Sequence, residues 1–310
     1  MQVLEGLLEP AERSVLTIGN FDGVHRGHRH LIARAQEEAA RRGLPVRVVT
    51  FEPHPAVVLG RPAGRFLLTP GSLKWRFMER LGVASVSVLP FTAEFAQLDA
   101  ESFLNDIVRD SLKAAHVVVG FNFTFGKGGL GNGELLRAWG ESQNIPVTVV
   151  EPYVDPGTGT SISSSRIRTL VREGAMEQAA ALLGHAYEVE SAVAAGDQRG
   201  REIGAPTLNL RVPSDQVMGP YGVYAGWISV RGRRLGAVAN WGVRPTFGGT
   251  EPSLEVHALE PLGFDHYGDL VRFEIGPYLR PEQRFESPEA LGAQIRKDVE
   301  EAAKWLETSR

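Results

Sequence analysis

Apolar runs alternate with amphipathic segments through the first 184 residues of the chain. Continuous apolar runs predict buried strands at 15–18, 46–51, 83–89, 117–119 and 147–150. Between them, apolar positions recur at helical spacing over 27–42, 69–81 and 99–112. Thr69-Pro70 and Asp99 are typical helix starts. Buried strands separated by helices indicate a parallel sheet covered on both faces, so we predict a doubly wound α/β domain.

The pattern changes after Gly184. Short strand-like runs, separated by glycine and proline turns, occupy 187–194, 207–212, 222–230, 235–241, 254–259 and 270–275. Because no helix-length segment intervenes, we predict an antiparallel β-barrel. A final helix begins at Ser287-Pro288, and its apolar stripe should pack against the barrel. The predicted domains are therefore 1–184 and 185–310, and the helical region 163–183 joins them.

Composition narrows the class of protein. A chain of 310 residues is long enough for two cores. Its net charge of −4 argues against a general nucleic-acid binder, and the absence of cysteine excludes disulfides and thiolate chemistry. The N-terminus is acidic and no apolar run reaches membrane-spanning length. We expect a cytoplasmic protein with no membrane partner, and a homo-oligomer is left open.

Three glycine- or proline-rich segments follow apolar runs of the first half: Gly19–His28, Phe51–Pro55 and Gly120–Gly133. In a parallel sheet the carboxyl ends of the strands form one edge, where ligands bind. We therefore expect these segments to converge on one crevice.

The first of these segments is an anion-site candidate. A strand that ends in a glycine turn and opens a helix leaves helix amides free, and histidines there can face phosphate oxygens. His25, His28 and His30 could instead form a metal cluster, but the spacing of three and the intervening Gly27 suit a turn better than a zinc helix. Solvated histidines are a further alternative.

Two polar pairs occur in strands of the second half. Thr207 and Asn209 are two residues apart, so both side chains leave one face, and their oxygens are ligands that magnesium accepts. Glu255 and His257 share a face opposite an apolar one. A surface strand has the same alternation, so the pattern alone does not choose between a site and a solvated face.

The ten-residue string Gly19-Asn20-Phe21-Asp22-Gly23-Val24-His25-Arg26-Gly27-His28 resembles the adenylyltransferase signature of bacterial bifunctional riboflavin kinase/FAD synthetases. The resemblance implies that His25 and His28 hold the ATP phosphates and stabilise charge during attack on the α-phosphate. It also implies nucleotide-binding roles for Gly19, Phe21, Asp22 and Gly27.

Three further segments of the first half resemble this family. In Phe51–Pro55, the resemblance implies that Pro53 and Pro55 border the flavin. Gly120–Gly126 is similar to a family segment in which Asn122 contacts the nucleotide. Ile162–Arg168 resembles another, with Ser165 where threonine is usual, and its implied nucleotide-binding residues are Ser163, Ser164, Arg166 and Arg168.

The second half resembles the riboflavin kinase part of the family. The string is Gly200–Asn209, with nucleotide contacts implied for Gly200, Gly204 and Pro206 and magnesium ligation for Thr207 and Asn209. By resemblance, Glu255 is the general base that takes a proton from riboflavin. Leu279–Phe285 also matches, and Arg280 is implied to bind flavin. Glu260-Pro261 replaces the usual aspartate-phenylalanine pair.

The resemblance covers nearly the whole chain and implies a bifunctional enzyme. Its barrel would phosphorylate riboflavin to FMN with Mg²⁺-ATP, and its α/β nucleotidyltransferase domain would convert FMN and a second ATP to FAD and pyrophosphate. Two alternatives are a monofunctional adenylyltransferase with a flavin-binding barrel and a non-catalytic flavin-responsive regulator. The presence of Thr207, Asn209 and Glu255 argues against the first, and that of both histidines against the second.

Overall fold

The structure is a computed structural model that describes residues 1–6, 12–60, 64–194, 207–243, 252–262 and 266–309. The chain forms two compact units. The first combines Met1–Gly64 with Gly71–Ser164, and the second combines Arg65–Pro70 with Ser165–Arg310. Each unit has its own sheet and core.

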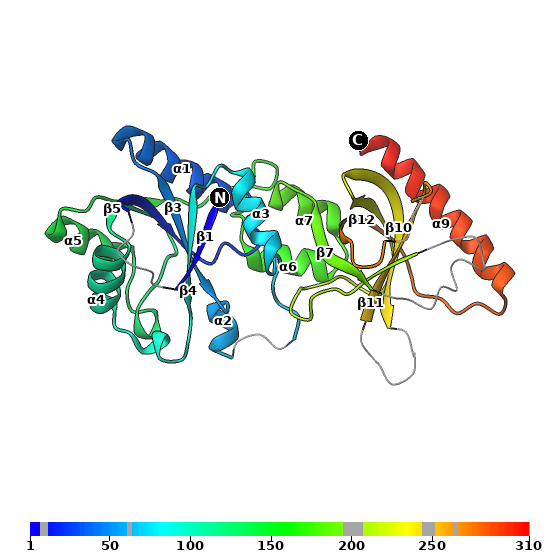
Figure 1. Cartoon of the computed structure of the whole chain (residues 1–310), viewed down its shortest axis with the longest axis horizontal. Helices are drawn as coiled ribbons and strands as arrows, with labels where there is room; N and C mark the ends of the chain where they lie inside the picture. The colour runs from blue at the N-terminus through cyan, green and yellow to red at the C-terminus, as the bar shows by residue number, and fades with distance from the viewer. Residues whose placement is uncertain (7–11, 61–63, 195–206, 244–251, 263–265, 310) are drawn as a thin grey trace. The chain divides into compact units, whose positions relative to one another are not determined.

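A six-stranded parallel sheet forms the centre of the first unit (Figure 1). Its spatial order is β1 (Gln2–Glu5), β4 (Ser85–Pro90), β3 (Val46–Glu52), β2 (Ser14–Ile18), β5 (Ala114–Gly120) and β6 (Val147–Val150). The chain proceeds from β2 to β3 and β4 on one side, and to β5 and β6 on the other. The strand order therefore reverses at β2, where such sheets form a ligand crevice. The predicted doubly wound sheet is confirmed.

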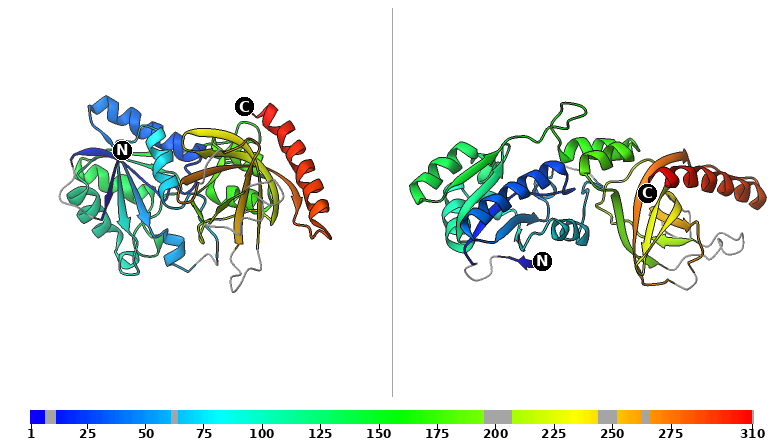
Figure 2. Two further views of the ribbon diagram at one scale, coloured as in Figure 1. Left: turned by 45° about the vertical axis from the view of Figure 1, so that its right-hand side comes forward. Right: turned by 90° about the horizontal axis from the view of Figure 1, so that it is seen from above.

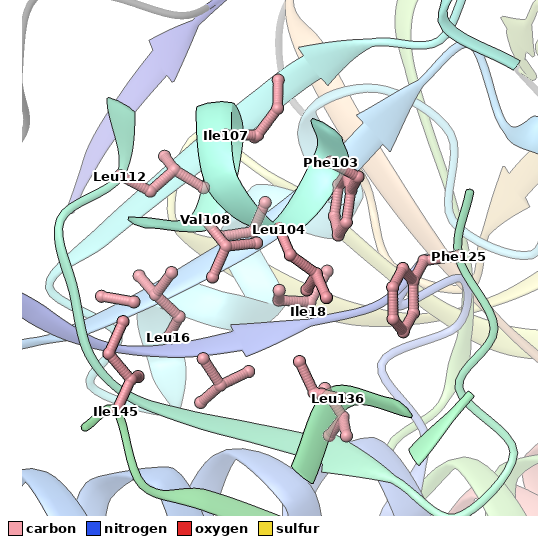
Figure 3. Close-up of a cluster of buried hydrophobic side chains, with 14 of the residues drawn as sticks. Leu16, Ile18, Phe103, Leu104, Ile107, Val108, Leu112, Phe125, Leu136 and Ile145 are labelled. Atoms are coloured by element: carbon pink, nitrogen blue, oxygen red, sulfur yellow. The ribbon is translucent and has the colours of Figure 1, made fainter. Parts of the chain in front are cut away.

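Helices cover both faces of this sheet. Helix α1 (Arg26–Arg42) and helix α3 (Ser72–Arg80) pack one apolar cluster against it. The other face carries α4 (Ala100–Ser102), the π-helix η2 (Phe103–Ser111) and α5 (Gly133–Gln143). Figure 3 shows this second cluster, where side chains of η2 and α5 meet Leu16 and Ile18 of β2. Shorter helical turns are α2 (Pro55–Val58), η1 (Phe95–Gln97) and η3 (Lys127–Gly129).

One helix start differs from its sequence prediction. Helix α3 begins at Ser72 with Gly71 as its N-cap residue, so Thr69 and Pro70 are not its cap and first residue. Both belong to the segment 65–70, which packs in the second unit. There the amides of Phe66 and Leu67 donate to the Asp215 carbonyl. These backbone bonds fix the segment in an extended conformation, and a helix can begin only after it.

A closed antiparallel barrel forms the centre of the second unit (Figure 2). Its strands, in order around the barrel, are β10 (Arg233–Val243), β11 (Pro252–Ala258), β8 (Leu208–Leu210), β7 (Tyr187–Ala194), β12 (Leu270–Pro281) and β9 (Gly222–Val230). Helices α6 (Ser164–Arg172) and α7 (Met176–Leu183) precede it. The predicted barrel is confirmed.

Helix α9 (Pro288–Thr308) closes the chain and packs on the barrel. Ser287 is its N-cap and accepts a hydrogen bond from the Ala290 amide at 3.2 Å. Ala302 is fully buried against Val223, Ala225 and Val238. The predicted capped, amphipathic C-terminal helix is therefore confirmed.

Candidate active sites

The turn between β2 and α1 holds the two histidines of the first candidate site. His25 is the N-cap residue of α1, and its Nδ1 accepts a hydrogen bond from the His28 amide at 3.2 Å. The two rings are stacked, with centroids 3.6 Å apart and planes within 12°. A Cβ at Gly27 would lie 3.2 Å from the His25 ring. The absence of a side chain at Gly27 therefore leaves room for the imidazole. Both imidazoles are thereby fixed at the start of a 17-residue helix.

The residues before His25 are buried and shape this turn. Phe21 is fully buried with φ of 51°, and its ring centroid lies 5.2 Å from that of His28. Gly19 passes close to the same phenylalanine ring. The Asp22 side chain is buried, and its carbonyl accepts a hydrogen bond from Ser164 Oγ at 2.8 Å. Ser163, the neighbour of Ser164, is exposed.

The third histidine lies apart from the stacked pair. His30 is exposed, and its ring centroid is 5.3 Å from that of Tyr153. Across the described ranges, no group of three or more histidine or acidic side chains is placed to hold a metal ion.

The segments after β3 and β5 lie at the same edge of the sheet. Thr50 Oγ1 donates to the Asn20 carbonyl at 3.2 Å, which joins the end of β3 to the histidine turn. Pro53 follows β3 directly after a cis peptide bond, and Pro55 is the first residue of α2. Asn122 follows β5, the other neighbour of β2, and is exposed. The expected convergence of the three segments therefore follows from the strand order β3-β2-β5.

The second candidate site lies on one face of the barrel. Glu255 in β11 is the register partner of Asn209 in β8 and of Asn240 in β10. Cross-strand partners project to the same face with Cβ atoms about 5 Å apart. Glu255 is 8% exposed, while Leu254 and Val256 point into the core on the opposite face. A buried carboxylate thus lies between two amides.

Other predicted residues of this half have different surroundings. Thr207 precedes β8 and is half-buried. Gly200, Gly204 and Pro206 lie outside the described residues. Arg280 in β12 forms a bidentate pair with the buried Asp298 of α9, with N–O distances of 2.8 and 2.7 Å. Its guanidinium therefore joins the C-terminal helix to the barrel.

Comparison with known proteins assigns each half of the chain to a protein family. Residues 8–166 match the FAD synthetase family model and residues 183–306 the riboflavin kinase model. The bifunctional riboflavin kinase/FMN adenylyltransferase of Escherichia coli K12 is 38% identical over 291 residues, which cover 93% of this chain and 91% of the relative. That of Bacillus subtilis 168 is 36% identical over 306 residues, covering 97% and 95%.

The chain belongs to the bifunctional riboflavin kinase/FMN adenylyltransferase family. It phosphorylates riboflavin to FMN and adenylylates FMN to FAD, so flavins and ATP are its substrates. A solved structure titled as a macrolide-efflux protein from Streptococcus pneumoniae is also similar, with a TM-score of 0.87 and 29% identity. The match covers 98% of this chain and all of that one. Among the described helices of this bifunctional enzyme, none is long and apolar enough to cross a membrane.

Two candidate residues of the adenylyltransferase belong to the second compact unit. Arg166 and Arg168 lie on α6. Arg168 is buried, donates from Nε to the Phe66 carbonyl at 2.8 Å, and has its guanidinium carbon 3.8 Å from the centroid of the Phe66 ring. Its charge thus fixes the segment 65–70 in that unit. Arg166 is half-buried on the same helix.

Asn240 and Glu282 lie at the second candidate site. Asn240 lies beside Glu255, and its Nδ2 donates to Glu282 Oε1 at 3.3 Å. A Cβ on Gly242 would overlap the Glu282 carboxylate, so that glycine makes room for it. The sequence pattern alone does not single out Asn240. Strand register, which brings residues 240 and 255 together, was the missing information.

Proposed function

We propose that His25 and His28 catalyse AMP transfer to FMN. The observation that carries this assignment is the stacked imidazole pair at the start of α1. An FMN phosphate oxygen attacks the α-phosphorus of ATP, the bond to the bridging oxygen breaks, and pyrophosphate leaves. FMN arrives with an anionic phosphate and needs no base, so charge stabilisation by imidazoles and helix amides is the contribution required.

The neighbouring residues then bind the two substrates. Gly19, Phe21, Asp22 and Gly27 shape the turn around the nucleotide. Asn122, Ser163, Ser164, Arg166 and Arg168 complete the nucleotide contacts. Pro53 and Pro55 border the flavin, since the fixed φ of two prolines gives a rigid surface suited to a flat ring.

We assign riboflavin phosphorylation to the face that carries Glu255. The riboflavin hydroxyl attacks the γ-phosphorus of ATP, its proton passes to the Glu255 carboxylate, and ADP leaves. Thr207 and Asn209 offer the hard oxygen atoms that Mg²⁺ prefers, and the register of Asn209 beside Glu255 supports this fit. When bound, the magnesium ion neutralises phosphate charge. Gly200, Gly204 and Pro206 would bind nucleotide and Arg280 flavin.

The domain assignment follows from these sites. We propose 1–184 as the adenylyltransferase and 185–310 as the kinase, with α6 and α7 packing beside the barrel. A cytoplasmic location suits an enzyme that consumes two ATP, and the net charge of −4 favours no nucleic-acid partner. Analytical ultracentrifugation of the purified protein measures whether the chain forms a homo-oligomer.

Purified protein incubated with riboflavin and ATP, with flavins separated over time, tests the assignment. With magnesium, FMN should appear first and FAD next, and EDTA should stop FMN formation. His28→Ala should stop at FMN, while the matched variant His30→Ala, which changes the exposed third histidine, should still make FAD. FAD formation by His28→Ala at the wild-type rate would contradict the histidine assignment. FMN formation in EDTA would contradict magnesium binding.

A further inference from the structure

A lysine in the first unit is buried where a charge is unfavourable. The Lys74 side chain on α3 is 2% exposed, and its Nζ lies 2.7 Å from Glu52 Oε1. Removing an ammonium ion from water is costly, and a buried ion pair is often no more stable than apolar side chains of similar volume. A gain in fold stability is therefore not a sufficient reason for this pair.

The partner carboxylate lies at the edge of the sheet where the substrates bind. Glu52 is the last residue of β3 and directly precedes Pro53. Its carbonyl accepts a hydrogen bond from the Phe91 amide at 3.0 Å, so the backbone position is fixed. Two residues earlier, Thr50 bonds the histidine turn at Asn20. The Glu52 backbone is therefore fixed directly before the flavin segment, at the edge of the sheet that also carries the histidine turn.

The two charges of the pair differ in their access to solvent. The Glu52 side chain remains 37% exposed, whereas Lys74 is almost completely covered. The buried lysine thus fixes the position of the Glu52 carboxylate, and part of that carboxylate remains accessible to a ligand. A carboxylate accepts hydrogen bonds and repels phosphate, so a group of FMN that it binds must be a neutral donor.

FMN offers such donors only in its flavin part. The ring has one imide N–H, the ribityl chain has hydroxyls, and the phosphate end is anionic. We propose that Glu52, held in place by Lys74, is a flavin-binding residue of the adenylyltransferase and accepts a hydrogen bond from FMN. It orients the substrate with its phosphate away from Glu52 and toward the histidine turn. This inference rests on the proposed flavin contact at Pro53 and Pro55.

Steady-state kinetics of Glu52→Gln and Lys74→Met test the inference. Loss of a hydrogen bond to a charged group should raise the KM for FMN roughly 10- to 100-fold. The KM for ATP should stay within about twofold, because the nucleotide lies against other residues. The unchanged KM for ATP reports that the first unit, which carries both substitutions, is folded. Riboflavin kinase activity, measured on the same preparations, should be unchanged because that reaction belongs to the second unit.

Arg47→Met provides the matched control. Arg47 is a buried cation on the same strand, bonded to Ser87 Oγ at 3.1 Å, but it lies at the opposite end of β3. Its loss should leave the KM for FMN unchanged. FMN methylated at the imide nitrogen identifies the donor: a Glu52→Gln penalty that disappears with this analogue indicates the imide, and one that persists indicates a ribityl hydroxyl.

An unchanged KM for FMN in both variants would overturn the inference, as would an equal rise in the KM values for FMN and ATP. Pro55→Ala separates this failure from failure of the flavin assignment. If Pro55→Ala raises the KM for FMN and Glu52→Gln does not, the flavin segment stands and Glu52 has no role in it. If neither variant raises it, the flavin lies elsewhere.

Discussion

Single residues explain why one chain needs two kinds of catalytic group. Riboflavin brings a neutral hydroxyl, whose proton needs an acceptor, and Glu255 offers a carboxylate flanked by the amides of Asn209 and Asn240. FMN brings a phosphate that is already ionised. For that substrate we propose that the imidazoles of His25 and His28 stabilise charge and remove no proton.

The close approach at Gly27 gives a prediction at this scale. In Gly27→Ala the new methyl group would lie 3.2 Å from the His25 ring and displace it. Because small misplacements of catalytic groups are costly, we expect kcat for FAD formation to fall roughly 10-fold. Gly292→Ala is the control, since a Cβ there meets only one side-chain atom, at 3.7 Å. Wild-type kcat in Gly27→Ala would refute the packing argument.

The candidate sites show which features of a residue can be predicted from the sequence and which cannot. The turn at residues 19–28 could be placed at a strand end because glycines and an apolar run mark it. The pairing of Glu255 with Asn240 could not, because register depends on turns and on neighbouring strands. The partners of Arg168 and Arg280 were equally inaccessible, since Phe66 and Asp298 lie in other elements of the chain.

At the level of elements, helix α9 is fixed to the barrel by the ion pair of Asp298 with Arg280 as well as by its apolar stripe. Asp298 accepts from Arg280 and also from Gln294 Nε2, at 2.9 Å. Asp298→Ala would leave the Arg280 guanidinium without its carboxylate partner. We expect the free energy of unfolding of the barrel to fall by about 3–5 kcal/mol.

Calorimetry resolves this effect if the two units unfold separately. The transition of the barrel should move to lower temperature, while FAD formation from FMN continues at 25 °C. Glu300→Ala, on an exposed position of the same helix, should leave both transitions in place. A barrel transition unchanged in Asp298→Ala would show that the apolar stripe alone fixes the helix.

Elements with strong patterns were predicted correctly, and the weakly patterned ones were not. Strands β2, β3 and β5 are mostly apolar and buried, and Asp99 caps its helix as expected. Strand β1 was missed because its four residues lie at a sheet edge and are mostly exposed. Helix α5 was missed because glycines open and interrupt it, although Gly140 fits closely against the Ile145 carbonyl.

The stability of the first unit as a whole should depend on a buried histidine. Burial and the nearby charges of Arg42 and Arg34 together lower the pKa of His116 from 6.5 to about 4, although Glu38 acts in the opposite direction. At a pH between 4 and 6.5, His116 is protonated in the unfolded chain and neutral in the folded chain. Stability is therefore complete above pH 6.5 and is lost as the pH falls toward 4, by about 3 kcal/mol.

Urea unfolding at several pH values measures this contribution. In His116→Gln the free energy of unfolding should fall less than in the wild type between pH 6.5 and 4. His30→Gln, which changes an exposed histidine, should follow the wild-type curve. Parallel curves for His116→Gln and the wild type would contradict a buried, neutral His116.

The whole molecule is a chain with two cores, in which one unit makes the substrate that the other consumes. The central claim is that each reaction has its own residues.

Mixing Glu255→Gln with His28→Ala tests this claim most directly. Riboflavin, ATP and magnesium are supplied, and Glu274→Gln is the barrel control. Each variant alone should make no FAD, and the mixture should make it, because FMN released by one variant reaches the intact site of the other. A mixture that makes no FAD, although Glu255→Gln converts added FMN and His28→Ala makes FMN, would contradict exchange of FMN through solution. Loss of both reactions in either single variant would contradict two independent sites.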